Sequence, residues 1–177
     1  MTQDEYEDCL EMARSLLGGG ESPSELWEAN ERINRALKMR PEEAEAWVIK
    51  AQVLSSLEDE VAGLAAANEA LRIAPKSAEA QYMRGALLYD MELYDDALPA
   101  LDKALQLVLL SDDWLLEEIY YEKAAVLDAL DRSDEAVAIF EEGLGRCPDS
   151  ELLRSGLAPL RRERVRRTFR VIPGGRT

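Results

Sequence analysis

One spaced pattern recurs four times along the chain, and it constrains the fold more than any other feature of the sequence. In each copy a small residue is followed by an apolar residue, a second small residue and, in three copies, a proline, at intervals of four, three and five positions. The copies are Ala29-Ile33-Ala36-Pro41, Gly63-Ala67-Ala70-Pro75, Ala97-Leu101-Ala104-Leu109 and Ala136-Phe140-Gly143-Pro148. The first three copies are evenly spaced, and the last follows after a slightly longer interval. A regular period of this kind predicts an array of similar supersecondary units.

The spacing within each copy is that of a helix. Residues three and four positions apart fall on one side of an α-helix. The proline then ends the helix, because it lacks a backbone N–H and biases its predecessor away from helical geometry. Ser77 and either Asp149 or Ser150 are candidate N-caps, and Pro99 falls near the start of its helix. No stretch alternates as a strand would, so we expect an all-α fold.

The segments before the copies carry small residues and leucines at matching positions, with an aromatic residue nearby. These residues are Trp47, Ala51 and Leu54, then Tyr82, Gly85 and Leu88, then Tyr120, Ala124 and Leu127. The whole pattern resembles the tetratricopeptide repeat (TPR) family, which has W-x2-L-G-x2-Y, then A-x3-F, then P, with a period of about 34 residues. The resemblance covers roughly residues 10–148. The first leucine of the motif is replaced by Lys50, Arg84 and Lys123, and Gly18-Gly19-Gly20 interrupts a degenerate first repeat.

This resemblance implies a right-handed α-solenoid of about four helix-turn-helix repeats with a C-terminal capping helix. The expected repeats span 4–41, 44–75, 78–109 and 117–148, and the expected cap spans 149–160, with Pro159 ending or kinking it. Residues 1–160 would then form the array, and 161–177 a basic tail. Each helix pair in such an array buries its apolar face only against its neighbours.

The resemblance also predicts where a partner binds. In similar proteins the first helix of each pair lines a concave groove that receives a peptide. The corresponding positions here are Val48, Gln52 and Ser55, then Tyr82, Met83, Ala86 and Tyr89, then Tyr121, Ala125 and Asp128. The three tyrosines would form an aromatic wall for an extended ligand, because tyrosine gives contact area at low entropic cost. The alternative is that they are ordinary packing or solvated surface residues.

Two further expectations concern this face. Trp47 and Tyr120 occupy the family's packing position, so they are expected in the core. Some TPR proteins clamp a peptide carboxylate with lysine, arginine and asparagine. Here only Arg14 could supply a basic group, so we do not expect a clamp of that kind.

Charge divides the chain into two parts. The formal net charge is −15, yet the segment 161–177 holds seven arginines and one glutamate and so carries +6, which leaves −21 on the segment 1–160. An acidic body should attract a basic partner and repel nucleic acid, although acidic surfaces also simply favour solubility.

The basic tail has three open interpretations. Its arginines could bind nucleic acid or an anionic membrane, its apolar residues could anchor it to an acidic TPR surface of this or another copy, or it could be solvated without a function. The residues concerned are Arg161, Arg162, Arg164, Arg166, Arg167, Phe169, Arg170, Val171 and Ile172.

Composition excludes several functional classes. The chain has no histidine, so it has no Ser-His-Asp or Cys-His machinery and no His-containing metal site. Nucleotide-binding, hydrolase and zinc-protease motifs are absent as well. We expect no enzyme, no cofactor and no metal. Cys9 and Cys147 cannot form a disulfide scaffold, and neither a signal peptide nor a membrane span is apparent, so we expect a cytoplasmic protein.

The sequence therefore predicts a non-catalytic scaffold, adaptor or chaperone-like protein that binds a protein or peptide, either basic or with aromatic or aliphatic anchors. Two alternatives remain open. One is a tether whose tail binds nucleic acid or an anionic membrane, and the other is a homo-oligomer with the tail of one copy on the acidic face of the next.

Overall fold

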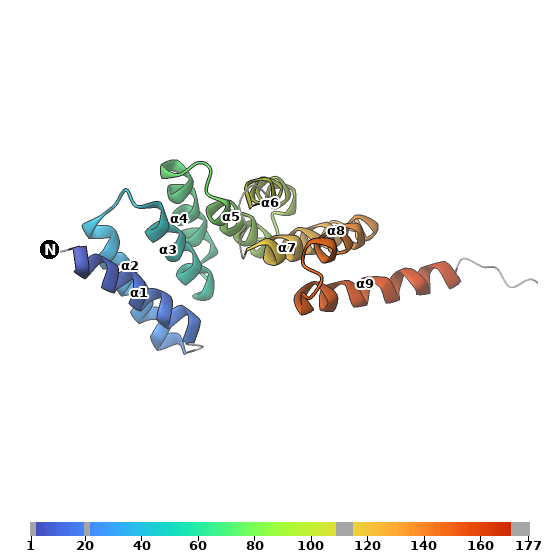
Figure 1. Cartoon of the computed structure of the whole chain (residues 1–177), viewed down its shortest axis with the longest axis horizontal. Coiled ribbons are helices and arrows are strands. Elements are labelled where there is room, and N and C mark those ends of the chain that lie inside the picture. The colour runs from blue at the N-terminus through green and yellow to red at the C-terminus, as the bar shows by residue number, and fades with distance from the viewer. Residues whose placement is uncertain (1–2, 20–21, 109–114, 171–177) are drawn as a thin grey trace, which may run out of the picture. The chain divides into compact units, whose positions relative to one another are not determined.

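The computed structural model describes residues 3–19, 22–108 and 115–170, and this part of the chain is helical without any strand. Figure 1 shows the helices in chain order. They are α1 (Gln3–Gly19), α2 (Pro23–Met39), α3 (Ala44–Ser56), α4 (Glu60–Ile73), α5 (Ala78–Asp90), α6 (Tyr94–Val108), α7 (Leu116–Ala129), α8 (Ser133–Arg146) and α9 (Glu151–Arg170). The expected all-α class is confirmed for the described residues. None of these described helices has the length and apolarity that crossing a membrane requires.

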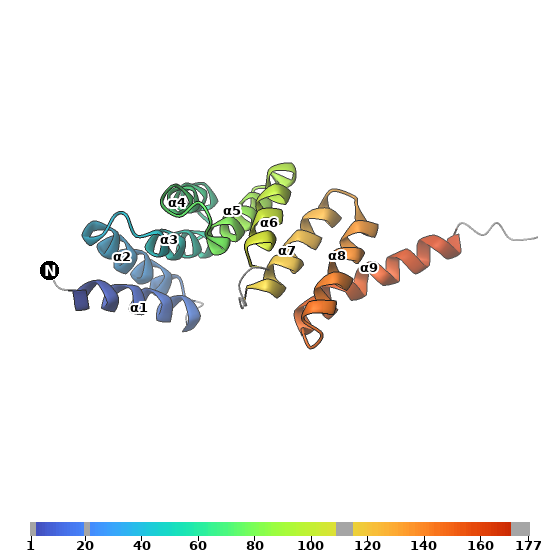
Figure 2. The same ribbon diagram turned by 45° about the horizontal axis from the view of Figure 1, so that its top comes forward.

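The chain divides into two compact units. The N-terminal unit is Met1–Leu107 and the C-terminal unit is Val108–Thr177. In the first, α1 packs with α2 and α3 with α4, and the pairs join through α2 with α3 and α4 with α5. In the second, α7 packs with α8, and α9 contacts both (Figure 2). The first helices of successive pairs also touch, α1 with α3 and α3 with α5, so they share one face of their unit.

The turns inside three helix pairs repeat the same backbone conformation. Glu58, Glu92 and Asp131 have φ of 59°, 60° and 59°, which is the left-handed region. The next residue in each turn donates its N–H back to the preceding helix, with Asp59 to Leu54, Leu93 to Leu88 and Arg132 to Leu127 at 2.8–2.9 Å. This bonding satisfies a carbonyl that the helix end leaves unpaired. The sequence repeat is therefore also a repeat of turn geometry.

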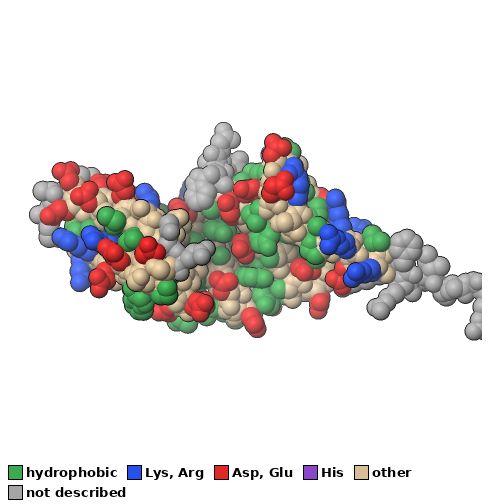
Figure 3. All heavy atoms as spheres, turned by 90° about the horizontal axis from the view of Figure 1, so that it is seen from below, with side chains coloured by type: hydrophobic (Ala, Val, Ile, Leu, Met, Phe, Trp, Pro, Cys, Tyr) green, Lys and Arg blue, Asp and Glu red, His purple; other side chains and the backbone are tan. Residues whose placement is uncertain are grey.

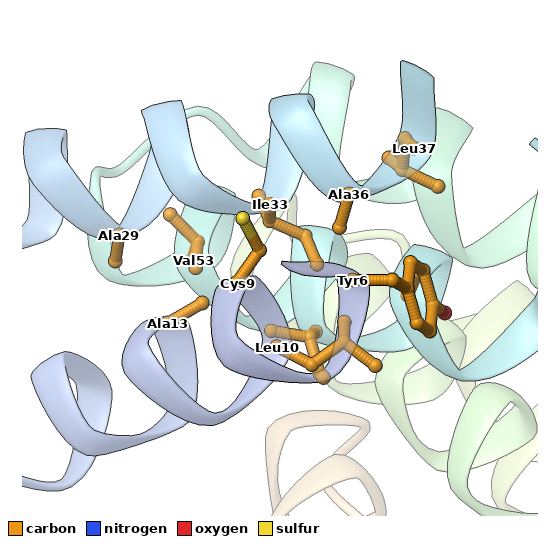
Figure 4. Packing of buried hydrophobic residues seen from close by; sticks show 11 residues of the cluster. Tyr6, Cys9, Leu10, Ala13, Ala29, Ile33, Ala36, Leu37 and Val53 are labelled. Atoms are coloured by element: carbon orange, nitrogen blue, oxygen red, sulfur yellow. The ribbon is translucent and has the colours of Figure 1, made fainter. Parts of the chain in front are cut away.

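The caps and the first core follow from the sequence. Ser77 Oγ accepts from the Ala80 N–H at 3.1 Å, and Ser150 rather than Asp149 caps α9, by accepting from the Leu153 N–H at 3.2 Å. In the first core, Cys9 of α1 faces Ile33 of α2 (Figure 4). The members of that core are Tyr6, Cys9, Leu10, Ala13, Ala29, Ile33, Ala36, Leu37, Ala46, Ile49 and Val53.

A departure from the family motif has a local explanation. Lys50 stands where the motif has leucine, and its ammonium group donates to the side-chain oxygens of Asn30 and Asn34 on α2, the latter at 2.8 Å. Burial lowers the pKa of this lysine, while nearby Asp59 acts in the opposite direction. A polar link between the first and second helix pairs thus replaces an apolar contact.

The end of the array differs from the expected capping helix over 149–160. Helix α9 runs without interruption to Arg170, and Pro159 lies inside it. A proline removes the bond from its own N–H to the carbonyl four residues earlier, here that of Ser155. Ser155 and Pro159 are both exposed, so water can hydrate this carbonyl and the helix continues. Figures 1 and 2 both show α9 extending past α7 and α8.

Small residues set how closely neighbouring helices approach. A Cβ on Gly63 would lie 2.9 Å from Leu87 Cδ2, and one on Gly143 would lie 2.9 Å from Tyr120 Cγ. The tightest of these contacts outside the last helix is at Gly85, where a Cβ would lie 2.6 Å from Cγ of the fully buried Leu101. A Cβ at any of these positions would force a neighbouring side chain to shift.

We predict opposite effects of one substitution at two helical glycines. Gly85→Ala should lower stability by about 1–3 kcal/mol, because overpacking against Leu101 outweighs the gain in helix propensity. Gly145→Ala should raise it by about 0.5–1 kcal/mol, since a Cβ there meets nothing within 4 Å. Urea unfolding followed by circular dichroism measures both. Changes in the free energy of unfolding that are equal and of the same sign in the two variants would contradict the packing argument.

Candidate functional site

The structure removes two residues from the predicted groove. Val48 and Met83 are only 2% and 6% exposed, and both belong to the core shared by α3, α4 and α5. Their side chains are engaged in packing, so a partner can reach little of either. The other predicted positions in the N-terminal unit, Gln52, Ser55, Tyr82, Ala86 and Tyr89, are partly exposed.

Polar contacts link the first helices of successive pairs. The Arg14 guanidinium on α1 pairs with Glu45 on α3, and Gln52 Nε2 on α3 donates to Glu79 Oε1 on α5 at 3.5 Å. Glu45 and Glu79 occupy matching positions of successive repeats, in the Ala-Glu-Ala segments 44–46 and 78–80. The sequence analysis did not assign these glutamates to the face, although that shared segment marks them. Arg14, the basic residue that the sequence offered for this face, is exposed and forms this ion pair with Glu45.

The predicted tyrosines in the N-terminal unit are anchored by neighbouring side chains. Tyr82 packs against the α3–α5 core, and the Tyr89 ring lies 5.6 Å from the Tyr94 ring of α6. Each tyrosine is therefore held by packing and partly exposed.

A pocket of about 340 Å³ lies in the C-terminal unit between α7 and α9, with one residue from α8. We call it the C-terminal pocket. It is lined by Tyr121, Ala124, Ala125 and Asp128 of α7, Phe140 of α8, and Ser155, Gly156, Pro159, Leu160 and Glu163 of α9. Three predicted groove residues, Tyr121, Ala125 and Asp128, therefore lie together in one cavity.

The pocket owes its shape to an aromatic pair and a glycine. The Tyr121 and Phe140 rings meet edge to face, with centroids 5.8 Å apart and planes at 71°. A Cβ on Gly156 would lie 2.5 Å from Phe140 Cζ and 3.0 Å from Tyr121 Cε2. Glycine at this position therefore leaves room for both rings. Gly156 and the rest of the α9 wall could not be predicted from the repeat pattern, because the pattern ends at Pro148, before α9 begins.

Tyr120 and Tyr121 are adjacent in the sequence but have different roles. Successive residues of an α-helix point in directions about 100° apart, so the two side chains have different surroundings. Tyr120 is fully buried, as expected, and its hydroxyl donates to Glu142 Oε1 at 2.9 Å. Burial and this hydrogen bond raise the pKa of Tyr120 to about 12. Trp47, the other expected core aromatic, is partly buried, and its indole N–H donates to the Pro41 carbonyl at 2.8 Å.

A second hollow, of about 570 Å³, lies beside the exposed Trp27. Its described lining residues all come from α2 and carry both signs of charge, with an ion pair between Arg32 and Glu28 at 2.9 Å. A hollow along one helix encloses less of a ligand than the C-terminal pocket does. Among the described residues, no cluster of cysteines and acids is placed to hold a metal ion.

The basic tail begins on the body of the protein. Arg161 pairs with Glu141 of α8 at 2.7 Å, and Arg164 pairs with Asp134 of α8 at 3.5 Å. Arg162 and Arg166, one turn apart, are exposed. Figure 3 shows several basic side chains gathered at this end of the described chain. The side chains of Arg167, Phe169 and Arg170, and all of Val171 and Ile172, lie outside the described part.

We predict that Tyr120 makes stability depend on pH in the alkaline range. Its pKa is higher in the folded chain, so its contribution is complete below about pH 10 and is lost as pH rises through about 12. Urea unfolding should show Tyr120→Phe less stable than the unsubstituted chain at about pH 9, with a smaller difference at about pH 11.5. A difference independent of pH would contradict this assignment.

Comparison with known proteins identifies the architecture. Family models described as tetratricopeptide repeat match residues 10–78 and 76–149. Similar solved structures include Pseudomonas aeruginosa PilF, with 19% identity, a TM-score of 0.76, and coverage of 91% of this chain and 70% of that one. MamA from Desulfovibrio magneticus RS-1 is 16% identical, with a TM-score of 0.72 and coverage of 93% and 88%.

YrrB, described as a TPR protein with an unusual peptide-binding site, is 21% identical, with a TM-score of 0.62 and coverage of 74% of this chain and 65% of that one. No curated protein matches the sequence. At these identities the solved structures establish the fold alone, whereas the two sequence matches together span residues 10–149. The chain belongs to the tetratricopeptide repeat family.

Proposed function

We propose that this protein is a non-catalytic adaptor that binds an extended segment of a partner protein through the first helices of its pairs. The family to which it belongs supplies protein–protein interaction scaffolds. The observation that carries the finer proposal is the C-terminal pocket, in which Tyr121, Ala125 and Asp128 meet. A cavity with one aromatic wall suits a single anchoring side chain of such a segment.

The N-terminal unit offers a separate set of partly exposed residues on its own first helices. Gln52, Ser55, Tyr82, Ala86 and Tyr89 are partly exposed there, and they offer polar groups beside aromatic edges. Tyrosines held by neighbouring side chains lose little further entropy on binding. YrrB, which has the same fold, is described as having an unusual peptide-binding site.

The adaptor has no catalytic role in this proposal, since the chain lacks histidine and the common catalytic motifs. A cytoplasmic location goes with the proposal, because both cysteines are free thiols. A chaperone-like role is one version of it, with a segment of a client protein as the bound ligand.

Filling the pocket should abolish partner binding. Ala125 is partly exposed in the pocket, whereas Ala138 is exposed on α8 outside it. The full chain, its Ala125→Gln variant and its Ala138→Gln variant are used as baits, and captured proteins are compared by quantitative mass spectrometry. We expect a partner that the full chain and Ala138→Gln retain and Ala125→Gln loses.

The affinity of that partner then tests the aromatic wall. Tyr121→Ala should weaken binding by about 2 kcal/mol, roughly 30-fold, measured by calorimetry on the purified pair. Thermal unfolding of each variant checks that the helices remain folded. Partners captured equally by Ala125→Gln and Ala138→Gln would refute the pocket as the binding site.

A tether is a second candidate function, and one observation favours it. Arg161 and Arg164 hold α9 against α8, while Arg162 and Arg166 remain exposed one turn apart. Two arginines on one side of a helix that extends past its neighbours are placed to bind phosphates of a nucleic acid or an anionic membrane.

The tether predicts loss of anion binding in an Arg162→Glu, Arg166→Glu double variant. Retention on heparin and sedimentation with phosphatidylserine vesicles at low salt measure this binding. The control, Arg35→Glu with Lys38→Glu, makes the same charge change on α2, where both residues are exposed. Equal retention of the two double variants on heparin would exclude a specific role for α9. A larger elution volume of the Arg162→Glu, Arg166→Glu variant than of the unsubstituted chain on a sizing column would instead indicate self-assembly.

A further inference from the structure

The C-terminal pocket combines an aromatic wall with carboxylates. Its charged lining residues among those described are Asp128 on α7 and Glu163 on α9, and both are acids. Tyr121 and Phe140 provide one wall, and Ala124, Ala125 and Leu160 add apolar surface. An occupant that satisfies all of these groups has a flat cationic end and an apolar stem.

The carboxylate of Asp128 is oriented by its own neighbour. Ser133 Oγ, at the start of α8, donates to Asp128 Oδ1 at 2.8 Å. A carboxylate has two oxygens and about four acceptor positions, so this bond fixes the group while leaving it able to accept from a ligand. Asp128 is exposed, which keeps its charge available without a large desolvation cost.

The aromatic wall is rigid as well. Phe140 is 3% exposed and holds the Tyr121 ring edge to face. Gly156 leaves no Cβ between the rings and the opposite helix. The partly exposed Tyr121 ring can therefore stack with a planar group that enters the pocket.

We propose that the C-terminal pocket binds an arginine side chain of an extended peptide in the partner protein. The guanidinium stacks on Tyr121 and donates to Asp128 and Glu163, while its methylene stem lies along Ala125 and Leu160. This inference rests on the adaptor function proposed above and specifies the chemistry of the partner at that site.

Other occupants fit the same groups less well. A peptide carboxylate would meet two like charges, and an aliphatic side chain would leave both acids without a partner from the ligand. A lysine has no planar face to stack on an aromatic ring. The chain as a whole carries a formal net charge of −15, so its field also favours the approach of a basic segment.

The test uses a matched series of short peptides, acetyl-Gly-Gly-X-Gly-Gly-amide, with arginine, citrulline, lysine, leucine or glutamate at X. Citrulline keeps the planar shape of arginine without its charge. Backbone amide shifts of the ¹⁵N-labelled full chain, followed at Ala125 and Gly156, report occupation of the pocket. We expect the arginine peptide to bind most tightly, and the citrulline peptide at least about fivefold more weakly.

Two variants separate the pocket charge from the general charge of the protein. Asp128→Asn should lower the affinity for the arginine peptide about three- to fivefold and leave the affinity for the citrulline peptide unchanged. Asp131→Asn removes the same charge in the turn that follows α7, at an exposed residue outside the pocket lining, and should change neither. Equal effects of the two variants would overturn the assignment of Asp128.

Other outcomes also decide between the proposals. Tighter binding of the leucine or glutamate peptide would overturn the inference about arginine and leave the adaptor function in place. The absence of any shift at the pocket with every peptide at about 10 mM would overturn the arginine site, while the bait comparison would test the adaptor function independently. If the amide resonances of Ala125 and Gly156 shift with protein concentration in the absence of any peptide, the occupant is a second copy of this chain, contrary to the proposal.

Discussion

Close approach of helices at small residues is the constraint on which the rest of this structure depends. No helix pair here has a core of its own large enough to fold alone, so each buries its apolar face against a neighbour. The distance between neighbouring helices is set where Gly63, Gly85 and Gly143 meet Leu87, Leu101 and Tyr120. A wider gap at any of these contacts would open a void in a core otherwise packed with alanine and leucine.

The candidate site follows from the same constraint at the end of the array. Gly156 allows α9 to approach Phe140 and Tyr121 as the glycines inside the array allow their neighbours to approach. No second helix after α9 is present among the described residues to cover its outer side. The side of α9 that faces α7 forms one wall of the C-terminal pocket. Gly156, Tyr121 and Phe140 therefore serve both the packing of the helices and the candidate site.

The sequence predicts the fold well because the repeated pattern records contacts that every helix pair must make. The same reasoning identifies Tyr120 as a core residue, and it places Tyr121, Ala125 and Asp128 together on another side of α7. Val48 and Met83 are buried in the core of α3, α4 and α5, because spacing along a helix gives the direction of a side chain but not how closely the neighbouring helix lies. Helix α9 continues past the expected cap to Arg170, because a proline removes one backbone hydrogen bond without preventing the later ones.

The two halves of α9 are held to the protein by different forces. Up to Leu160 the helix is anchored by buried leucines, whereas beyond it the described contacts are the ion pairs of Arg161 with Glu141 and Arg164 with Asp134, all with exposed side chains. Exposed pairs contribute at most about 1 kcal/mol each and weaken as salt increases. Glu163, at the edge of the pocket, lies in this second half. Added salt should therefore loosen the contact of that edge with α8 more than it changes the packing of the aromatic wall opposite.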